Sequence, residues 1–345
     1  MSSASSTNPA TTEQVLAISR LLGDQITSVE TLSGGRNSRV FSIQYGDSER
    51  CVAKFYPDES TNLRSRQDAE FDGFTFLRNS GIESVPKPIA IDKESRCAVY
   101  EFVDGTPVAT TSPSAEDISQ VVGFLASLDQ LCGSEGSTEL QTAADACFSV
   151  NDLLVDIDSR LQRLLAVNES TPQHSALSDF LANKLEPRLT IAKRTCEEGL
   201  RRQGLTFESI LDRSQRTLSP SDFGFHNMLR LADGNLVFLD FEYFGWDDPA
   251  KMICDFLLHP AMELSDEVKQ QFLSGILENF SRQPDLADRV KIVMPLCGLK
   301  WSLLLLNEFV PAHLQRRQFA SERPLDIARL QMEQLNKSQL MLEKV

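Results

Sequence analysis

The sequence predicts an α+β fold with two lobes: a small antiparallel sheet with one helix, followed by a large, mainly helical lobe. Two observations lead to this prediction. Through about the first hundred residues, short apolar runs of strand length are separated by turn residues. Beyond them, apolar residues recur at the spacing of helices, interrupted by one loop-and-strand region at residues 217–242. A chain of 345 residues is long enough to form two lobes.

Composition indicates an ordinary globular protein. Hydrophobic residues make up 41% and charged residues 24%, which fits neither a disordered chain nor a membrane protein. The formal net charge is −15 and Lys and Arg form no dense run, so we expect no nucleic-acid partner. The start lacks a signal-peptide pattern, and no stretch approaches the roughly 18 apolar residues of a membrane span. We therefore expect a cytoplasmic protein with no membrane partner.

Two further features of the sequence fit this class. The seven cysteines are scattered and form no Cys-x-x-Cys pair, so we expect reduced thiols rather than a metal site. The most apolar late run, residues 292–306, contains Pro295 and Lys300 and predicts a buried helix.

The first lobe is expected to span residues 13–105, after a disordered tail of residues 1–12. Its predicted elements are three strands within 29–56, a helix from about Leu63 to Asn79, and two strands at 87–92 and 96–103. The second lobe is expected to span residues 106–345. It begins with a capping box at Ser114 and Asp117, and its helices are interrupted by a loop at 217–230 and a buried strand ending within 236–242.

Lys54 and Glu70 form a candidate pair in the first lobe. Lys54 closes an apolar strand, and Glu70 falls on the apolar stripe that Phe74 and Leu77 mark on the following helix. A carboxylate on that face needs a cation, and Lys54 is the candidate. A strand lysine held by a helix glutamate orients the α- and β-phosphates of ATP in kinases. The alternative is that Lys54 extends to solvent.

A glycine-rich segment at residues 33–38 lies between two of the predicted strands. Gly34 and Gly35 carry no side chain, so backbone amides there can approach phosphate oxygens. The segment matches neither Gly-x-Gly-x-x-Gly nor the Walker pattern, and an ordinary hairpin remains the alternative.

Three polar residues of the loop-and-strand region match a catalytic pattern. Asp222 and Asn227 are five apart, and Asp240 follows thirteen residues later at the end of the buried strand. Phosphoryl transfer needs a group that accepts the hydroxyl proton and oxygen ligands for the metal. Each residue alone fits a turn cap or a strand end. Together, downstream of a Lys and Glu pair, they favour a phosphotransferase.

The sequence resembles the aminoglycoside phosphotransferase and choline kinase-like family, which has a two-lobed protein-kinase-like fold. The resemblance covers most of the chain. It is carried by LSGGRNSRV, VAK, Glu70, YEFVDG, SDFGFHN, LDFE and WDDPAKMICDF. The resemblance implies transfer of the γ-phosphate of ATP, or alternatively GTP, to a hydroxyl of a small molecule with the help of Mg²⁺. An amino sugar, an amino alcohol or a sugar is the expected kind of acceptor.

The resemblance also assigns roles. Asp222 in the catalytic loop, 217–230, is the expected base, and Asn227 and Asp240 are the expected Mg²⁺ ligands. The other implied roles are a phosphate clamp at Lys54 and Glu70, phosphate contacts at Gly34 and Gly35, adenine contacts from the backbone of Glu101 and Val103, and structural roles for Asp248 and Asp255.

Three departures from the family pattern stand out. Pro220 and Ser221 precede Asp222 where the family has His and Gly, which raises a catalytically silent pseudokinase as the alternative function. His226 is interpreted as a structural histidine rather than a substrate contact. Glu242 follows the strand-end Asp and Phe, and we expect it to point into solvent.

The acceptor is expected to be small. Only seven residues separate Asp240 from Asp248, too few for the long activation segment with which protein kinases hold a peptide. The stretch from Ser114 to Leu211 would wall the acceptor pocket. Its acidic residues Asp152, Asp156 and Asp158 are interpreted as solvated helix surface. The sequence leaves acceptor identity and oligomeric state open, and no Gly-x-Ser-x-Gly elbow surrounds Ser219 or Ser221 to support a serine hydrolase.

Overall fold

The computed structural model describes residues 10–23, 26–32, 38–46, 49–57, 64–280, 283, 285–320 and 324–344. The chain forms two compact units, and neither is continuous in sequence. Unit 1 comprises Met1–Pro107, Asn227–Tyr243 and Gln315–Leu325, and unit 2 comprises Val108–His226, Phe244–Leu314 and Asp326–Val345. The chain first passes from unit 1 to unit 2 after Pro107, close to the predicted boundary between residues 105 and 106. In contrast to the prediction, residues 227–243 belong with the N-terminal segment.

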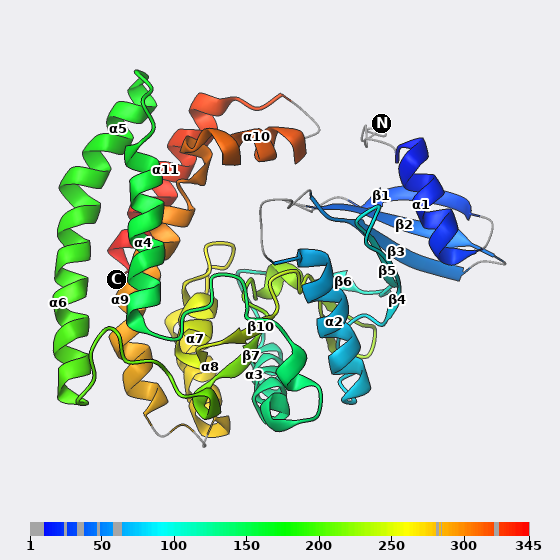
Figure 1. The fold of residues 1–345 in the computed structure, drawn as a ribbon, viewed down its shortest axis with the longest axis horizontal. Helices are drawn as coiled ribbons and strands as arrows, with labels where there is room; N and C mark the ends of the chain where they lie inside the picture. Colours follow the sequence, from blue (N-terminus) through cyan, green and yellow to red (C-terminus); the bar gives the residue numbers. More distant parts are fainter. Residues whose placement is uncertain are drawn as a thin grey trace. The chain divides into compact units, whose positions relative to one another are not determined.

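Unit 1 contains a five-stranded antiparallel sheet, as the alternating sequence predicts (Figure 1). Its strands are β1 (Ile26–Leu32), β2 (Arg39–Tyr45), β3 (Glu49–Phe55), β4 (Pro88–Asp92) and β5 (Cys97–Glu101). They pair in the order β1-β2-β3-β5-β4. Strand β3 therefore lies in the middle of the sheet, where Lys54 pairs with Val40 on one side and Ala98 on the other. A central strand is a rigid support for a functional side chain.

Two helices, α1 (Thr12–Leu22) and α2 (Arg66–Asn79), belong to unit 1. On β3, Ala53 and Phe55 lie in the core cluster with Ile18 of α1. Side chains alternate along a strand, so Lys54 faces the opposite side of the sheet. The expectation of one helix in this lobe is wrong, because α1 is a second one. It begins at Thr12, the last residue of the predicted tail, and residues 1–9 of that tail lie outside the described residues.

A three-stranded antiparallel sheet holds residues 227–243 in unit 1. Its strands are β6 (Thr106–Pro107), β8 (Met228–Arg230) and β9 (Leu236–Phe238), in the order β6-β8-β9. Phe238 N–H donates to Ser84 O at 2.8 Å, and the rings of Phe74 and Phe241 lie 4.9 Å apart. Hydrogen bonds and aromatic packing thus attach the end of β9 to the region around α2, which explains why the sequence-based boundary misplaces this segment.

Unit 2 is mainly helical, as predicted. Its helices are α3 (Ala115–Gln130), α4 (Val150–Leu165), α5 (Pro172–Phe180), α6 (Glu186–Arg202), α7 (Pro249–Leu258), α8 (Asp266–Asn279), α9 (Leu286–Leu304) and α11 (Ile327–Glu343). Helix α10 (Pro311–Ala320) begins in unit 2 and continues into unit 1. The predicted capping box is present, because Ser114 and Asp117 exchange hydrogen bonds at the start of α3.

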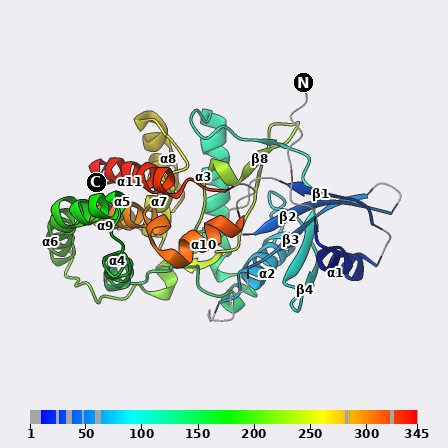
Figure 2. The ribbon, with the colours of Figure 1, turned by 90° about the horizontal axis from the view of Figure 1, so that it is seen from above.

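Helix α9 forms the centre of unit 2, where it contacts α4, α6, α7 and α11 (Figures 1 and 2). Within the described residues, the segment Leu286–Phe309 is the one stretch long and apolar enough to cross a membrane, and 61% of its most apolar window is buried. Lys300 within it is 4% exposed and lies 3.7 Å from Asp255. A buried, ion-paired lysine in its middle agrees with the buried helix that the sequence predicts.

A strand pair in unit 2 supports the loop that carries Asp222. The strands β7 (Thr217–Ser219) and β10 (Gly245–Asp247) are antiparallel, with Ser219 opposite Gly245. Gly245 packs so tightly that a Cβ there would lie 2.3 Å from the carbonyl oxygen of Gln141. Glycine is therefore required at this position.

Candidate active site

Lys54 is the centre of a buried ion cluster in unit 1. Its Nζ lies 2.6 Å from Glu70 Oε2, 2.5 Å from Asp240 Oδ1 and 3.3 Å from Glu242 Oε2. Lys54 comes from strand β3, Glu70 from helix α2, and the two other acids from the segment after β9. The structure thus brings together Lys54, Glu70 and Asp240 from three separate parts of the sequence.

Glu70 is fixed by more than the lysine. Its Oε2 accepts a hydrogen bond from Tyr56 Oη at 2.7 Å, and the hydroxyls of Tyr56 and Tyr100 lie 2.7 Å apart. Its Oε1 accepts from the backbone N–H of Phe241 at 3.2 Å. A carboxylate that is 3% exposed needs such partners, and together they fix its direction. The Phe241 bond also ties α2 to the residue next to Asp240.

The expectation that Glu242 points into solvent is wrong. The residue is 2% exposed. Its carboxylate accepts from Ser38 Oγ at 3.1 Å and pairs with Arg66 Nη1 at 3.1 Å, in addition to Lys54. Two cations from distant parts of the chain balance its charge and a hydroxyl donates a hydrogen bond to it, so the buried carboxylate has partners. No signal in the neighbouring sequence reveals these partners.

The pKa values of both Lys54 and Asp240 are raised, which favours the charged form of the lysine and the neutral form of the aspartic acid. Burial disfavours the charged form of Lys54, but Asp240, Glu70 and Glu242 outweigh burial and raise the pKa of its ammonium well above its usual range. Burial raises the pKa of Asp240 to about 7, and the like charges of Glu242 and Glu70 add to burial against the attraction of Lys54. One ammonium among three carboxylates leaves the cluster short of positive charge.

The donor atoms of this cluster fit a divalent cation. One carboxylate oxygen from each of Glu70, Asp240 and Glu242 lies within 4.8 Å of the others. Asn227 is attached to the same segment, because its carbonyl oxygen accepts from the N–H of Leu239 at 2.9 Å. Mg²⁺ prefers carboxylate and carbonyl oxygens, and a second positive charge would offset the burial and the carboxylate repulsion that together raise the pKa of Asp240.

The remaining expected nucleotide contacts lie partly outside the described residues. This is the case for Gly34 and Gly35. Glu101 ends β5, and its carboxylate accepts from the backbone N–H of Lys87 at 3.1 Å and pairs with Arg78. Val103 follows in the segment between β5 and β6 and is partly exposed. The side chain of Glu101 is therefore occupied by structural partners.

In unit 2, Asp222 follows an unusual turn. Ser221 has a positive φ of 68°, and the N–H of Asp222 donates to the carbonyl oxygen of Pro220 at 3.0 Å. This three-residue turn with a positive φ at its centre is rare and strained for a residue other than glycine. Ser219 at the end of β7 supports it, because its Oγ accepts from the N–H of Ser221 at 3.1 Å. The turn sets the direction in which Asp222 leaves the strand.

Two histidines contact the Asp222 carboxylate. His259 Nε2 lies 2.8 Å from Oδ1, and His226 Nε2 lies 3.6 Å from the same oxygen. Burial by itself raises the pKa of Asp222, but His226 and His259 outweigh burial and hold this pKa below its usual range. Of the two, His259 is the direct hydrogen-bond partner, since 3.6 Å is beyond normal reach. Asp222 is therefore ionised at neutral pH.

Several residues that surround Lys54 and Asp222 in the structure are not identified from the sequence. Tyr56, Ser38 and Arg66 surround the carboxylates near Lys54, and His259 contacts Asp222 from 37 positions away. Only spatial proximity connects these residues with the motifs, so no local pattern could have singled them out.

The acidic residues after Asp240 have structural partners in unit 2. Lys251 is 2% exposed and pairs with Asp247 at 2.7 Å and Asp255 at 2.9 Å. Asp248 caps the start of α7 and pairs with Arg289 of α9. These contacts agree with the structural roles expected for Asp248 and Asp255. On α4, Asp152 and Asp158 are exposed as expected, whereas Asp156 is partly buried beside Arg160.

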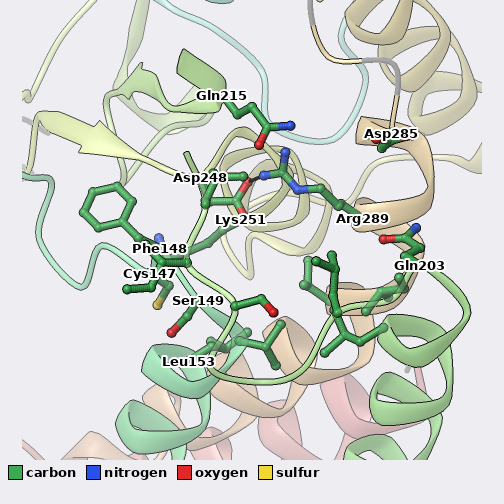
Figure 3. A pocket seen from close by; sticks show the side chains of 18 of the residues that line it. Cys147, Phe148, Ser149, Leu153, Gln203, Gln215, Asp248, Lys251, Asp285 and Arg289 are labelled. Atoms are coloured by element: carbon green, nitrogen blue, oxygen red, sulfur yellow. Dashed lines mark hydrogen bonds and ion pairs between the residues drawn. The ribbon is translucent and has the colours of Figure 1, made fainter. Parts of the chain in front are cut away.

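A cavity of about 470 Å³ lies in unit 2 beside this network (Figure 3). Its lining includes Gln215, which precedes β7, and Asp248, which follows β10. These residues flank the end of the strand pair where Thr217 faces Asp247. Asp222 follows the opposite end, where Ser219 faces Gly245. The cavity is therefore separated from the Asp222 loop by the length of the strand pair.

The serine hydroxyls next to Asp222 are occupied by backbone partners. Ser219 is fully buried and accepts from Ser221 N–H, and Ser221 Oγ donates to the carbonyl oxygen of Ala144 at 3.3 Å. Neither hydroxyl is arranged as a nucleophile paired with a base, so the site does not support a serine hydrolase.

Comparison with known proteins agrees with the fold. Residues 28–286 match the model of the phosphotransferase enzyme family. No curated protein is similar enough to count as a match.

Three solved structures illustrate the likeness in fold. A choline kinase from Streptococcus pneumoniae is 17% identical with a TM-score of 0.58, and the match covers 96% of this chain and 99% of that one. An ethanolamine kinase from Plasmodium vivax is 14% identical with a TM-score of 0.61, covering 92% and 83%. A spectinomycin phosphotransferase in complex with ADP and spectinomycin is 12% identical with a TM-score of 0.63, covering 95% and 100%. The chain belongs to the phosphotransferase enzyme family and has the protein-kinase-like fold of its small-molecule kinases.

Proposed function

We propose that the protein transfers the γ-phosphate of ATP to a hydroxyl group of a small molecule, with Mg²⁺ as cofactor. The observation that carries this proposal is the Lys54 ammonium, held in unit 1 between Glu70 at 2.6 Å and Asp240 at 2.5 Å. Phosphoryl transfer depends on positioning and on neutralising phosphate charge, and a fixed ammonium beside a metal-binding carboxylate supplies both.

Lys54 and Glu70 act together in this proposal. Glu70 holds the ammonium with one oxygen and is itself held by Tyr56 and Phe241. The ammonium stays charged because the carboxylates around it raise its pKa. It would bind the α- and β-phosphate oxygens as a fixed point charge, so that the γ-phosphate is presented in one orientation.

Asn227 and Asp240 would hold Mg²⁺, with Glu242 near enough to contribute a further oxygen. When bound, the ion would neutralise the charge of the phosphates and of the leaving group. The positive φ of Asp240, 63°, directs its side chain away from the regular course of β9 and towards Lys54. The cost of this backbone conformation is of the order of 1–3 kcal/mol and is typical of functional sites.

Asp222 would accept the proton of the attacking hydroxyl. A base must be ionised before the reaction, and the low pKa of Asp222 meets this condition. The side chain is 38% exposed, so a ligand can reach it. Its hydrogen bond with His259 leaves the carboxylate directed rather than freely rotating.

The acceptor is proposed to be an amino alcohol, an amino sugar, a sugar or a related metabolite. The solved relatives are named for choline, ethanolamine and spectinomycin. The short stretch between Asp240 and Asp248 supports a small acceptor, because residues 245–247 already form β10 and Pro249 begins α7. The segment therefore contains no peptide-binding activation loop.

A catalytically silent nucleotide-binding protein is the less favoured alternative. The Pro220-Ser221 departure motivates it, but the turn still leaves Asp222 ionised and hydrogen-bonded. Lys54, Glu70 and Asp240 are likewise in contact. A protein that had lost catalysis would have no need of this buried charge, which is costly to maintain.

An Asp222→Asn variant tests the function. We expect turnover to fall about 100-fold or more, because the amide cannot accept the proton. Nucleotide affinity is expected to change less than about threefold, since the phosphate and metal contacts are elsewhere in the proposal. The measurement is ATP consumption across amino alcohols, amino sugars, sugars and nucleosides, with nucleotide binding measured by calorimetry.

The matched control for this experiment is Asp266→Asn. Asp266 is in the first turn of α8 and its side chain is 94% exposed, so turnover is expected to remain at the wild-type level. Turnover unaffected by Asp222→Asn would contradict the role of Asp222. ATP binding with no acceptor-dependent consumption in either protein would favour the silent alternative, and parallel assays with GTP decide the nucleotide.

A further inference from the structure

We propose that His259 is a positioning residue, which orients the Asp222 carboxylate for its reaction with the acceptor hydroxyl. This inference rests on the proposed function, and it assigns to α7 a role that none of the sequence motifs indicates.

The hydrogen bonds of His259 define its tautomer. Its Nδ1 accepts a hydrogen bond from the backbone N–H of Ala261 at 3.2 Å. A nitrogen that accepts carries no proton, so the neutral ring carries its proton on Nε2. That Nε2 lies 2.8 Å from Asp222 Oδ1 and therefore donates to it. The backbone after α7 thus selects the tautomer that directs a donor at the carboxylate.

The ring of His259 is also held in place by its neighbours. It is 7% exposed and occupies the C-cap position of α7. The His226 ring stacks on it with centroids 4.3 Å apart and planes at 24°, and Trp301 of α9 meets it edge-on at 4.8 Å. A ring packed on two sides and hydrogen-bonded at both nitrogens has one orientation. It can therefore restrict the rotation of a carboxylate that is itself partly exposed.

The same three residues, Asp222, His226 and His259, also have the composition of a metal site. The geometry favours the hydrogen bond instead. Ligands of a tetrahedral zinc ion at about 2.0–2.2 Å lie about 3.3 Å or more apart, whereas His259 Nε2 and Asp222 Oδ1 are 2.8 Å apart. The two imidazoles are nearly parallel, so their in-plane lone pairs do not converge on one ion. His259 Nε2 and Asp222 Oδ1 are therefore interpreted as a hydrogen-bond donor and acceptor rather than as two ligands of one metal ion.

Orientation matters here because the base must lie within about 2.6–3.2 Å of the hydroxyl it serves. If His259 fixes one carboxylate oxygen, it also fixes where the other points. Losing that restraint is expected to lower the rate about 10- to 100-fold, the scale of a displacement of about 1 Å at a reacting group. Nucleotide binding should be spared, because His259 contributes to the direction of the base rather than to the phosphate contacts.

Two variants separate positioning from packing. His259→Leu keeps bulk but removes the donor, and His259→Gln places an amide N–H at the reach of Nε2. We expect kcat to fall about 10- to 100-fold in His259→Leu with KM for ATP changed less than about twofold, and His259→Gln to recover most of kcat. The assay uses Mg·ATP and the most active acceptor from the consumption screen.

The control is His174→Leu. His174 is also a buried histidine of unit 2, 5% exposed, and its Nδ1 pairs with Thr171 Oγ1 at 2.7 Å instead of with Asp222. This variant should keep the wild-type kcat at a temperature where it is folded. An unchanged kcat in folded His259→Leu, or equal loss in the Leu and Gln variants, would overturn the positioning role.

A spectroscopic measurement on the wild-type protein keeps the test independent of folding and of turnover. ¹⁵N-labelled histidine should show His259 as the Nε2–H tautomer by NMR. The Nδ1–H tautomer, or a zinc ion bound through His259 after dialysis against zinc, would overturn the inference. Failure of the proposed function would show differently, as turnover that is absent in the wild type or unaffected by Asp222→Asn.

Discussion

Lys54 carries one positive charge and lies within 3.3 Å of three carboxylates. Arg66 adds a second positive charge through its pair with Glu242, and the raised pKa of Asp240 reflects the burial and the negative charge that remain. Protonation of Asp240 would remove one of the three negative charges around Lys54. At the scale of residues, the charge balance around Lys54 therefore makes the behaviour of the metal-free protein depend on pH.

The raised pKa of Asp240 predicts a pH dependence of stability. Its pKa is about 7 in the folded protein and about 3.9 in an unfolded chain. Between these values the folded state binds the proton more tightly, so the contribution of Asp240 to stability is present at low pH and is lost as pH rises towards 7. In EDTA, the melting temperature of the wild type relative to Asp240→Asn should therefore decrease from pH 5 to pH 8.

The side chain of Asp240 is 41% exposed, so water screens part of the repulsion and only the direction of the effect is predicted. Comparison with Asp240→Asn at each pH cancels the titration of groups that do not interact with Asp240. A melting-temperature difference that stays constant across this range would contradict the assignment.

Ser221→Gly is expected to stabilise the protein. Ser221 has a φ of 68°, which glycine adopts without the steric cost that a side chain brings. Removing the backbone strain is expected to stabilise the protein by about 1–2 kcal/mol. Two effects oppose this gain: the greater conformational freedom of glycine in the unfolded chain, which costs about 0.5–1 kcal/mol, and the loss of the 3.3 Å hydrogen bond from Ser221 Oγ to the carbonyl oxygen of Ala144. We expect a net gain of up to about 1 kcal/mol in urea unfolding. A loss of stability would show that the serine hydroxyl outweighs the backbone strain.

Individual site residues differ in how far the sequence predicts them. Lys54 and Glu70 are predictable as a pair because strand alternation and helical spacing place both on apolar faces. Glu242 is predicted wrongly, because its hydrogen-bond donor Ser38 and its ion-pair partner Arg66 are about two hundred positions away. His259 has no sequence signal at all, since its relation to Asp222 arises only when α7 packs in unit 2.

At the scale of elements, β10 depends on the absence of a side chain. A Cβ on Gly245 would lie 2.3 Å from the carbonyl oxygen of Gln141 and 2.5 Å from the carbonyl carbon of Thr142. Both atoms belong to the backbone and cannot rotate away. Gly245→Ala should therefore lower the free energy of unfolding by about 3 kcal/mol or more, as expected for severe overpacking.

The control for this prediction is Gly123→Ala in α3, where a Cβ would meet no atom within 4 Å. Alanine is the better helix former, so that variant is expected to gain about 0.5–1 kcal/mol. Equal unfolding midpoints in urea for Gly245→Ala and the wild type would show that the 141–143 segment can move.

Element prediction from the sequence succeeds where the pattern is local. The five strands of the large sheet and the start of α3 follow from alternation and from a capping box. Helix α1 had equally local signals, a capping box between Thr11 and Gln14 and a C-cap at Gly23, but the Ser- and Thr-rich start obscured them. Helix α1 was therefore predictable from local signals in the sequence.

At the scale of the whole molecule, bound nucleotide should increase stability. A ligand that binds only the folded state at 100 times its Kd adds about 2.7 kcal/mol to the free energy of unfolding. We expect Mg·ATP to raise the melting temperature and ATP in EDTA to raise it less, because Asp240 repels the phosphates without a cation. Lys54→Met should abolish most of the shift, whereas Lys291→Met, at a lysine with a 76% exposed side chain, should retain it. Equal shifts with and without Mg²⁺ would contradict the metal proposal.

The two-part organisation follows from the sequence, but its boundaries follow only in part. The first boundary is visible as the change from strand to helix patterns near residue 105. The return of residues 227–243 to unit 1 is not visible, because it depends on β8 pairing with β6 and on Phe241 packing against Phe74. Pairing between strands that are distant in sequence produces no periodic residue pattern from which it could be predicted.

The discontinuity of unit 1 has a consequence during translation. Lys54 and Asp240 are 186 positions apart, so the ribosome synthesises Lys54 well before Asp240. At about 5–20 residues per second, this delay is roughly 10–40 s. The Lys54 ammonium on the nascent N-terminal sheet must remain without the Asp240 carboxylate for that time, and β6 must remain without β8. Chaperone capture of arrested nascent chains should thus be strongest for those that stop between residues 107 and 243.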